Sequence, residues 1–135
     1  MVETQLAGLY DPRMTLAPER ARELVRGALA FGGSVDVVQQ GPLTLGVSPM
    51  ASEPRSPDAE RPLCAMEGRL RLTSGPALAQ PWATEAEVAA AWSAAGDEML
   101  RSARGSVLVA LWDEGRRRGL VARDQLGERP FMYHA

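Results

Sequence analysis

Two stretches of the chain have the spacing of amphipathic helices. Between residues 18 and 31 the apolar positions share one face while charged residues fill the other, and these positions are Ala21, Leu24, Val25, Ala28 and Leu29. Pro18 suits the first turn of this helix, and Gly32 with Gly33 suits its end.

The second predicted helix begins at Thr84. Glu87 follows three residues later, so the pair can form a capping box in which each side chain binds the other's backbone amide. Val88 and Trp92 belong to one buried stripe, and Gly96 is expected to end the helix. A short further turn is expected over residues 97–103.

Strand patterns fill most of the remaining chain. "SVDVVQQGPLTLGVS" predicts strands at 34–39 and 43–48 around a turn with Gly41 and Pro42. Residues 62–72 predict a strand pair, or a strand plus turn, around Glu67 and Gly68. "SVLVALWD" is apolar on both faces and predicts a central strand, joined through "EGRRR" to a strand in "GLVARD". The three arginines are expected to be solvated at the hairpin tip rather than to form a phosphate site.

The order of these elements is β, α, ββ, ββ, α, ββ. This order predicts an α+β fold with mostly antiparallel pairing, and no glycine-rich phosphate loop follows a strand. Residues 50–61 contain proline and charged residues without periodicity and are expected to be an exposed loop. A domain linker is disfavoured, since neither flank is large enough to fold alone. The 135 residues, 45% of them hydrophobic, therefore predict a single domain over 1–135.

Composition excludes several classes of function. The net charge of −2 comes from interspersed acids and bases, so nucleic acid is not an expected partner. There is no basic leader and no apolar run of membrane length, so a cytoplasmic protein without membrane contact is expected. One cysteine and one histidine leave no Cys/His metal site. Cys64 is expected to be a small buried hydrophobe rather than a reactive thiol.

Residues 84–134 resemble the second half of the amino-terminal glutaminase domain of asparagine synthetases. That family has S-D-x-E, a helix, a G-x-F-A-x-x-x-W-D strand, a hairpin and R-D-x-x-G-x-x-P-L-Y-Y. Matching residues here are Glu87, Gly96, Gly105, Ala110, Trp112, Asp113, Arg123, Asp124, Gly127, Pro130 and Tyr133. "LAGLYDP" at 6–12 and "LTLGVSPM" at 43–50 are similar to the family's opening and to its L-G-H-x-R-L strand.

The resemblance implies an N-terminal-nucleophile hydrolase fold of class II glutamine amidotransferases, with two antiparallel sheets between helices. Such a domain releases ammonia from glutamine and passes it to a synthetase domain that activates a carboxylate with ATP. The chain has no S-G-G-x-D-S pyrophosphate loop. No cofactor is therefore expected in this chain, and ATP and Mg²⁺ are expected only in an associated synthetase domain.

At the catalytic positions the chain departs from the family. The nucleophilic cysteine is replaced by Thr4, which would have a free amine only if the residues before it were removed. Pro49 stands where an arginine would hold the substrate carboxylate with a two-pronged hydrogen bond.

The family's oxyanion motif N-G-E becomes Glu67, Gly68 and Arg69. A carboxylate at Glu67 would repel the oxyanion unless protonated, and Arg69 reverses the local charge. Glu85 replaces the aspartate of S-D-x-E; it could hold an amine, but an exposed acid in a first helical turn is the interpretation favoured.

The matching positions near the end of the chain have structural explanations. Gly127 and Pro130 shape a turn, and Arg123 with Asp124 is expected to form a local ion pair that holds it; catalytic use of the pair is the alternative. Relatives continue with further strands, so the sandwich is expected to be incomplete at the carboxyl end. Residues 131–133 would then form an uncovered sheet edge that favours self-association or a partner.

Three functions follow from these expectations. The favoured one is a catalytically degenerate glutaminase-like domain that acts as a scaffold for a synthetase or cyclase domain or subunit, with β-lactam synthetase or lasso-peptide cyclase as the nearest subgroup. The alternatives are a glutamine-hydrolysing ammonia donor of an asparagine synthase and a non-enzymatic module that binds a protein or peptide.

Overall fold

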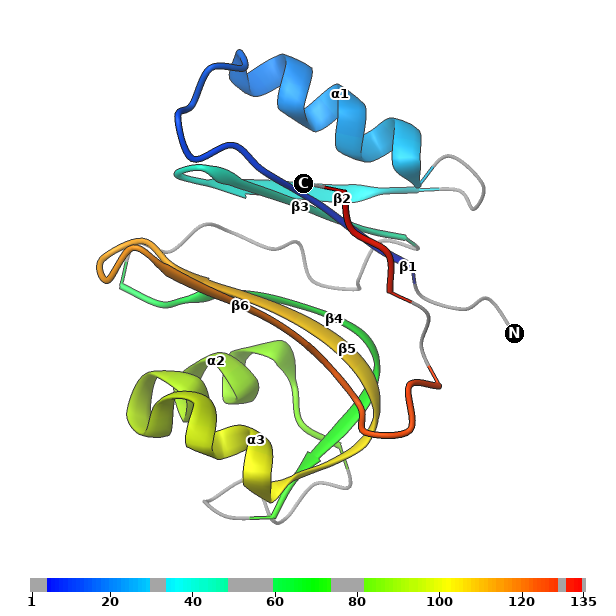
Figure 1. The fold of residues 1–135 in the computed structure, drawn as a ribbon, viewed down its shortest axis with the longest axis vertical. Helices are drawn as coiled ribbons and strands as arrows, with labels where there is room; N and C mark the ends of the chain where they lie inside the picture. Colours follow the sequence, from blue (N-terminus) through cyan, green and yellow to red (C-terminus); the bar gives the residue numbers. More distant parts are fainter. Residues whose placement is uncertain (1–4, 30–33, 49–59, 74–81, 129–130, 135) are drawn as a thin grey trace.

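Two antiparallel sheets face each other in the computed structural model, which describes residues 5–29, 34–48, 60–73, 82–128 and 131–134. One helix covers the outer side of the first sheet and two helices cover the outer side of the second, giving four layers (Figure 1). The predicted α+β class and two-sheet sandwich are thus confirmed. Within the described ranges, no helix has both the length and the apolar character required to cross a bilayer.

Sheet A contains β1 (Gln5–Tyr10), β2 (Asp36–Gln40) and β3 (Leu43–Ser48), with β3 in the centre. The helix α1 (Pro18–Ala28) contacts all three strands. Gly46 permits this close packing, because a Cβ atom there would lie 2.5 Å from Val25 of α1. The helix ends at Ala28, before the predicted Gly32 and Gly33, which lie outside the described residues.

Sheet B contains β4 (Leu63–Leu72), β5 (Ala103–Asp113) and β6 (Arg118–Arg123), with β5 in the centre as predicted. The helix α2 (Glu85–Ala95) has the predicted capping box between Thr84 and Glu87, and Gly96 ends it with φ of 60°. The expected further turn consists of η2 (Gly96–Glu98) and α3 (Met99–Ser102). These local predictions are confirmed.

The prediction of a strand pair or a strand plus turn over residues 62–72 is wrong. This stretch is the single strand β4, paired without interruption to β5 from Leu63↔Trp112 to Leu72↔Ala103. Gly68 has φ of 95°, but glycine can adopt this angle and the strand continues on both sides of it. The long, apolar β5 is the reason, because it provides backbone partners along the full length of β4.

Apolar side chains form two cores, one on each side of sheet B. The core between the two sheets contains Val38, Leu45, Leu63 and Trp112. The core between sheet B and its helices contains Val88, Trp92, Val109 and Leu111, together with Cys64. Burial of Cys64 confirms that it packs as a small apolar residue.

The arginines of the β5–β6 hairpin have specific partners in addition to solvent. Arg117 lies 6.0 Å from the Trp112 ring centroid and pairs with Glu114. Arg118 donates to Asp97 at 2.6 Å, and Asp97 also accepts from the Trp92 indole. These contacts hold the hairpin against both cores, so Arg117 and Arg118 have structural roles.

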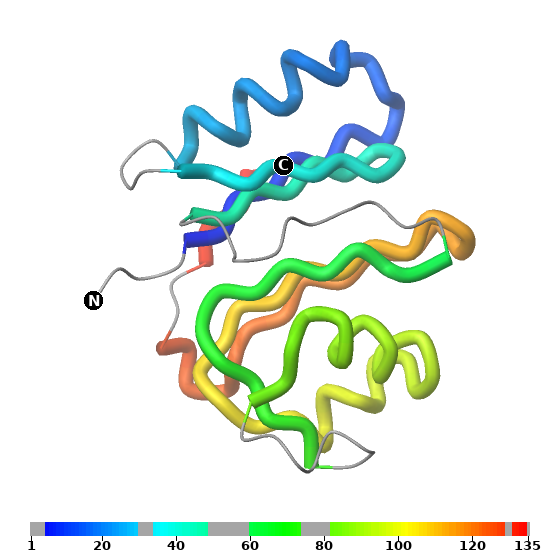
Figure 2. Tube along the Cα trace, turned by 180° about the vertical axis from the view of Figure 1, so that it is seen from behind, coloured from blue at the N-terminus to red at the C-terminus, as the bar shows by residue number. Residues whose placement is uncertain are grey.

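The chain beyond β6 rises from the level of sheet B to that of sheet A (Figures 1 and 2). Phe131, Met132 and Tyr133 are exposed, as expected, but residues 131–134 form no strand. The predicted sheet edge at these residues is therefore wrong. No strand within the described ranges pairs with this segment, and a strand requires such a partner.

Candidate functional site

One side of sheet B faces sheet A and changes from apolar to polar along its length. Leu63 and Ala65 of β4 belong to the core between the sheets. Side chains alternate along a strand, so Glu67 points the same way. The register pairs Glu67 with Leu108 and Leu108 with Arg123, which places a carboxylate and a guanidinium on this face.

Glu67 connects the two sheets. Its half-buried carboxylate accepts a hydrogen bond from the backbone N–H of Leu6 at 3.1 Å. Leu6 is the second residue of β1, so the contact joins the amino-terminal strand to the position that the sequence resemblance assigns to the oxyanion donor. Two other predicted positions, Thr4 and Pro49, lie outside the described residues.

Glu85 connects α2 to β4. Its carboxylate accepts a hydrogen bond from the backbone N–H of Met66 at 2.9 Å. The expectation of an exposed acid in the first turn is wrong, because Glu85 is half-buried and bonded to the neighbouring strand. Two adjacent residues of β4 thus form hydrogen bonds that involve a carboxylate. Glu67 accepts with its own side chain, and the Met66 amide donates to Glu85.

Arg69 is exposed and lies against an aromatic ring. Its guanidinium carbon is 5.7 Å from the centroid of Trp82, a cation–π distance. Sequence reasoning identified Arg69 as a charge reversal but missed Trp82. The two residues are 13 positions apart by number (82 − 69) and become neighbours only through tertiary structure.

The predicted ion pair between Arg123 and Asp124 is wrong. In the described part of the chain, Asp124 instead accepts the backbone N–H of Glu128 at 3.2 Å, and the N–H of Gly127 binds the Asp124 carbonyl. Gly127 has φ of 66°, as a tight turn requires. Consecutive strand residues point to opposite faces, which separates the two charges. Pro130 lies outside the described residues.

The turn at Asp124 predicts a dependence of stability on pH. Desolvation by burial raises the pKa of Asp124, but hydrogen bonds from the Glu128 and Gly127 backbone outweigh it, so the pKa lies below its ordinary 3.8. A lowered folded-state pKa means that the unfolded state binds the proton more readily. The stabilisation is therefore present above pH 3.8 and is lost as pH falls through the lower folded value.

We expect Asp124→Asn to remove this contribution. The free energies of unfolding of the variant and the parent, measured with urea, should differ most at neutral pH and converge as the pH falls below 3.8. A difference in unfolding free energy that is independent of pH would contradict the carboxylate's role in the turn.

The described groups at this end of the sandwich do not form a nucleophilic pair. Cys64 is buried on the opposite face of sheet B, in the core against the helices. Within the described ranges, no group of three His, Cys, Asp or Glu residues could hold a metal ion. What these residues offer is an acceptor, Glu67, that already holds the amide of the first strand.

Residues 69–135 match the family model of the glutamine amidotransferase domain. The matched region runs from β4 through the helices α2 and α3 to the β5–β6 hairpin and the turn at Asp124. Searches among curated proteins and among solved structures give no match. By this match, residues 69–135 are similar to a glutamine amidotransferase domain.

Proposed function

We propose that this chain is a glutamine amidotransferase domain that has lost glutamine hydrolysis and serves as a scaffold for an ATP-dependent, amide-forming synthetase domain or subunit. The observation that carries the proposal is the contact between the Glu67 carboxylate and the Leu6 amide, 3.1 Å apart. This contact supports the proposal because Glu67 acts in it as an acceptor, whereas the resemblance implies a donor at this position.

Hydrolysis of an amide develops negative charge on the substrate oxygen. Enzymes stabilise this oxyanion with N–H or O–H donors, and loss of one donor reduces the rate by about 10²–10³-fold. An ionised carboxylate donates no hydrogen bond and repels the oxyanion. Glu67 is therefore unfavourable for this reaction in its present position.

The contacts of neighbouring positions also support a structural use. Glu85 holds the Met66 amide, which fixes the start of α2 on sheet B. Arg69 lies over Trp82. Both side chains thus have structural partners at positions where the family holds its substrate.

The second candidate is an active glutaminase that supplies ammonia. The match of residues 69–135 to the glutamine amidotransferase family favours it, since hydrolysis of glutamine is the reaction that the family's name implies. In this candidate Thr4 would be exposed by processing and act as the nucleophile.

A glutaminase assay separates the two candidates. The full chain is incubated with L-glutamine and glutamate is measured, with Thr4→Ala and Cys64→Ala variants in parallel. We expect no glutamate above the buffer blank for any of the three proteins, while circular dichroism shows that each is folded. Turnover that Thr4→Ala or Cys64→Ala abolishes would establish the active glutaminase instead.

A further inference from the structure

The outer side of sheet A carries a small pocket beneath the start of α1. It has a volume of about 100 Å³, and Met14 at its mouth is 60% exposed. Gly46 of β3 packs against α1, so Thr44, two residues earlier in the strand, points to the same side. Figure 1 shows α1 on this side of sheet A and sheet B on the other. The pocket is thus separated from Glu67, which lies between the sheets.

Two buried oxygen atoms of this pocket lack a hydrogen-bond partner among the described residues. Thr44 is 0% exposed, and its Oγ1 atom is one of the two. The other is the Oε1 atom of Gln39. Gln39 is the cross-strand partner of Thr44, so both side chains reach the pocket from neighbouring positions on one face of the sheet. Buried polar atoms are normally paired, so these two require a partner from outside the described chain.

A carboxylate lies beside these oxygens. The ladder of β1 and β3 extends to Asp11 through a backbone hydrogen bond, which puts Asp11 on the same side as Leu9, the cross-strand partner of Thr44. Its Oδ2 atom accepts the Leu16 amide at 2.8 Å, and the Thr15 hydroxyl lies 3.3 Å from both carboxylate oxygens. The bond from Leu16 lowers the pKa of Asp11 below its ordinary 3.8, so the carboxylate is charged at neutral pH.

Nearby arginines leave this negative charge available. Arg20 and Arg22, at the start of α1, each pair with a glutamate of the same helix. Arg13 is exposed and does not line the pocket. Hydrogen bonds and desolvation set the pKa of Asp11, and within the described ranges no ion pair reaches it. The pocket therefore offers three oxygen acceptors and one uncompensated negative charge.

We propose that this pocket binds a primary ammonium group on a short aliphatic stem. The three N–H groups of an ammonium donate to the Asp11 carboxylate, Gln39 Oε1 and Thr44 Oγ1, and the carboxylate selects a cation over a neutral donor. The other lining residues are mainly apolar and suit the stem; they include Leu9, Leu16, Pro18 and Ala21.

The size of the pocket limits the ligand. A water molecule takes about 30 Å³, so the pocket has room for about three or four non-hydrogen atoms. A free short amine and the end of a lysine side chain from a partner both present this chemistry. Because the pocket lies on the outer side of sheet A, the inference does not depend on the proposed function.

An NMR titration of the full chain with ethylammonium chloride tests the proposal. Tetramethylammonium chloride at the same ionic strength is the control, because it carries the charge and has no N–H group. We expect saturable shifts of the Gln39 and Thr44 amide signals with ethylammonium only. The expected Kd is about 1–10 mM, near the limit for so small a ligand. Tighter binding of Nα-acetyl-lysine amide than of ethylammonium would identify a lysine side chain as the source, and weaker binding a free amine.

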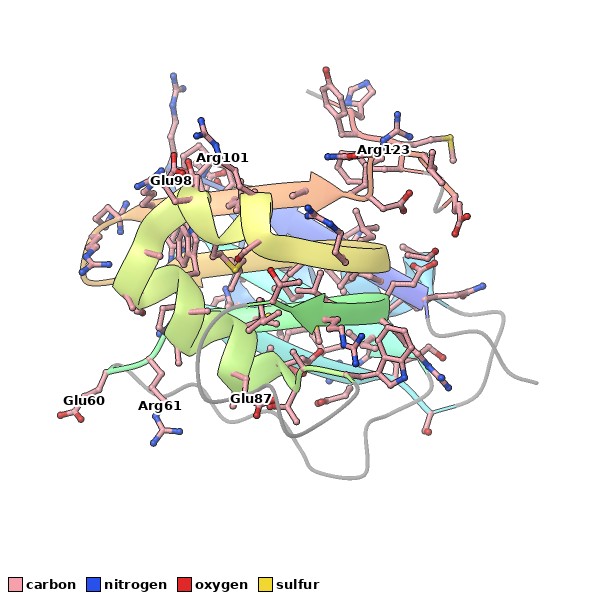
Figure 3. All side chains as sticks on the ribbon, turned by 90° about the horizontal axis from the view of Figure 1, so that it is seen from below. Glu60, Arg61, Glu87, Glu98, Arg101 and Arg123 are labelled. Atoms are coloured by element: carbon pink, nitrogen blue, oxygen red, sulfur yellow. The ribbon has the colours of Figure 1, made fainter. Side chains whose placement is uncertain are left out.

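Three variants locate the binding site. Asp11→Asn should weaken ethylammonium binding by about ten-fold, because a charged hydrogen bond is lost. Thr44→Val keeps the shape of the side chain and should weaken binding by about three-fold or more. Glu98→Gln makes the same change of charge as Asp11→Asn on the far side of the molecule, next to α3, where Figure 3 labels Glu98; it should leave the Kd unchanged. Circular dichroism checks that each variant is folded.

Several results would overturn the proposal. Equal shifts with the two salts, or no saturable shift up to about 100 mM ethylammonium, would show that the pocket holds water alone. Equal Kd values for the parent, Asp11→Asn and Thr44→Val would place any binding elsewhere on the chain and would also reject it.

Discussion

Replacing Trp112 by alanine should lower the free energy of unfolding by about 3–5 kcal/mol. The indole is only 3% exposed and lies in the core between the sheets. Its ring centroid is 5.6 Å from that of Tyr10, and its N–H donates to the Glu114 carboxylate at 2.7 Å. The substitution leaves a cavity between the sheets and removes the donor that Glu114 binds. Urea denaturation followed by circular dichroism measures the loss.

Two further variants make this result interpretable. A domain of this size is stable by about 5–15 kcal/mol, so Trp112→Ala could fail to fold. Trp112→Phe keeps most of the ring and should lose about 1–2 kcal/mol, mainly from the missing N–H. Trp82→Ala changes an indole that is 43% exposed and should cost less than about 1 kcal/mol. Equal losses for Trp112→Ala and Trp82→Ala would contradict the two-sheet core.

Gly105→Ala is the second substitution with a large expected effect. Gly105 lies in β5 with φ of 146°, a conformation that other residues rarely adopt. A Cβ atom there would lie within van der Waals overlap of the Arg69 carbonyl oxygen on the paired strand β4. Because the obstacle is backbone, the two strands must separate, and we expect a loss of about 3 kcal/mol or more. Thermal and urea unfolding both report it.

Two other glycines provide controls for Gly105. Gly96 has positive φ but open space around its Cβ position, so Gly96→Ala tests the backbone angle alone and should cost about 1 kcal/mol. Gly27 is in α1 with nothing within 4 Å, and Gly27→Ala should stabilise by about 0.5–1 kcal/mol. If Gly105→Ala lowers the free energy of unfolding no more than Gly96→Ala does, the close packing of β4 and β5 at Gly105 is contradicted.

The elements that sequence patterns predicted well are those set by nearby residues. The capping box of Thr84 and Glu87 needs only one helical turn, and it forms as predicted. The apolar run of β5 requires cover on both faces, which two separate cores provide. Hairpin turns depend on a few consecutive residues, so β2–β3 and β5–β6 were also found at the expected places.

The errors arose where distant parts of the chain decide the structure. A glycine within residues 62–72 suggested a turn, but pairing with β5 keeps β4 continuous. Neighbouring opposite charges suggested an ion pair at Arg123 and Asp124, but strand alternation and the backbone of the following turn take Asp124 away.

The candidate site was predictable in its residues and not in its contacts. The resemblance identified Glu67 and Glu85 as positions of interest. Their partners, the amides of Leu6 and Met66, are backbone groups that no sequence pattern marks. The Glu67 contact spans 61 positions of sequence and depends on how sheet A lies over sheet B. Only the tertiary structure shows that this carboxylate is a link between the sheets.

The most direct test of a scaffold domain without glutaminase activity is an NMR titration of the isotopically labelled chain with L-glutamine. The backbone amides of Leu6 and Gly68 report on the surroundings of Glu67, and the same spectra detect any glutamate formed. We predict that both amide signals keep their positions up to about 10 mM glutamine, well above the affinity of ordinary substrate sites, and that no glutamate appears. Saturable shifts of Leu6 and Gly68 accompanied by accumulating glutamate would contradict the proposed loss of hydrolysis.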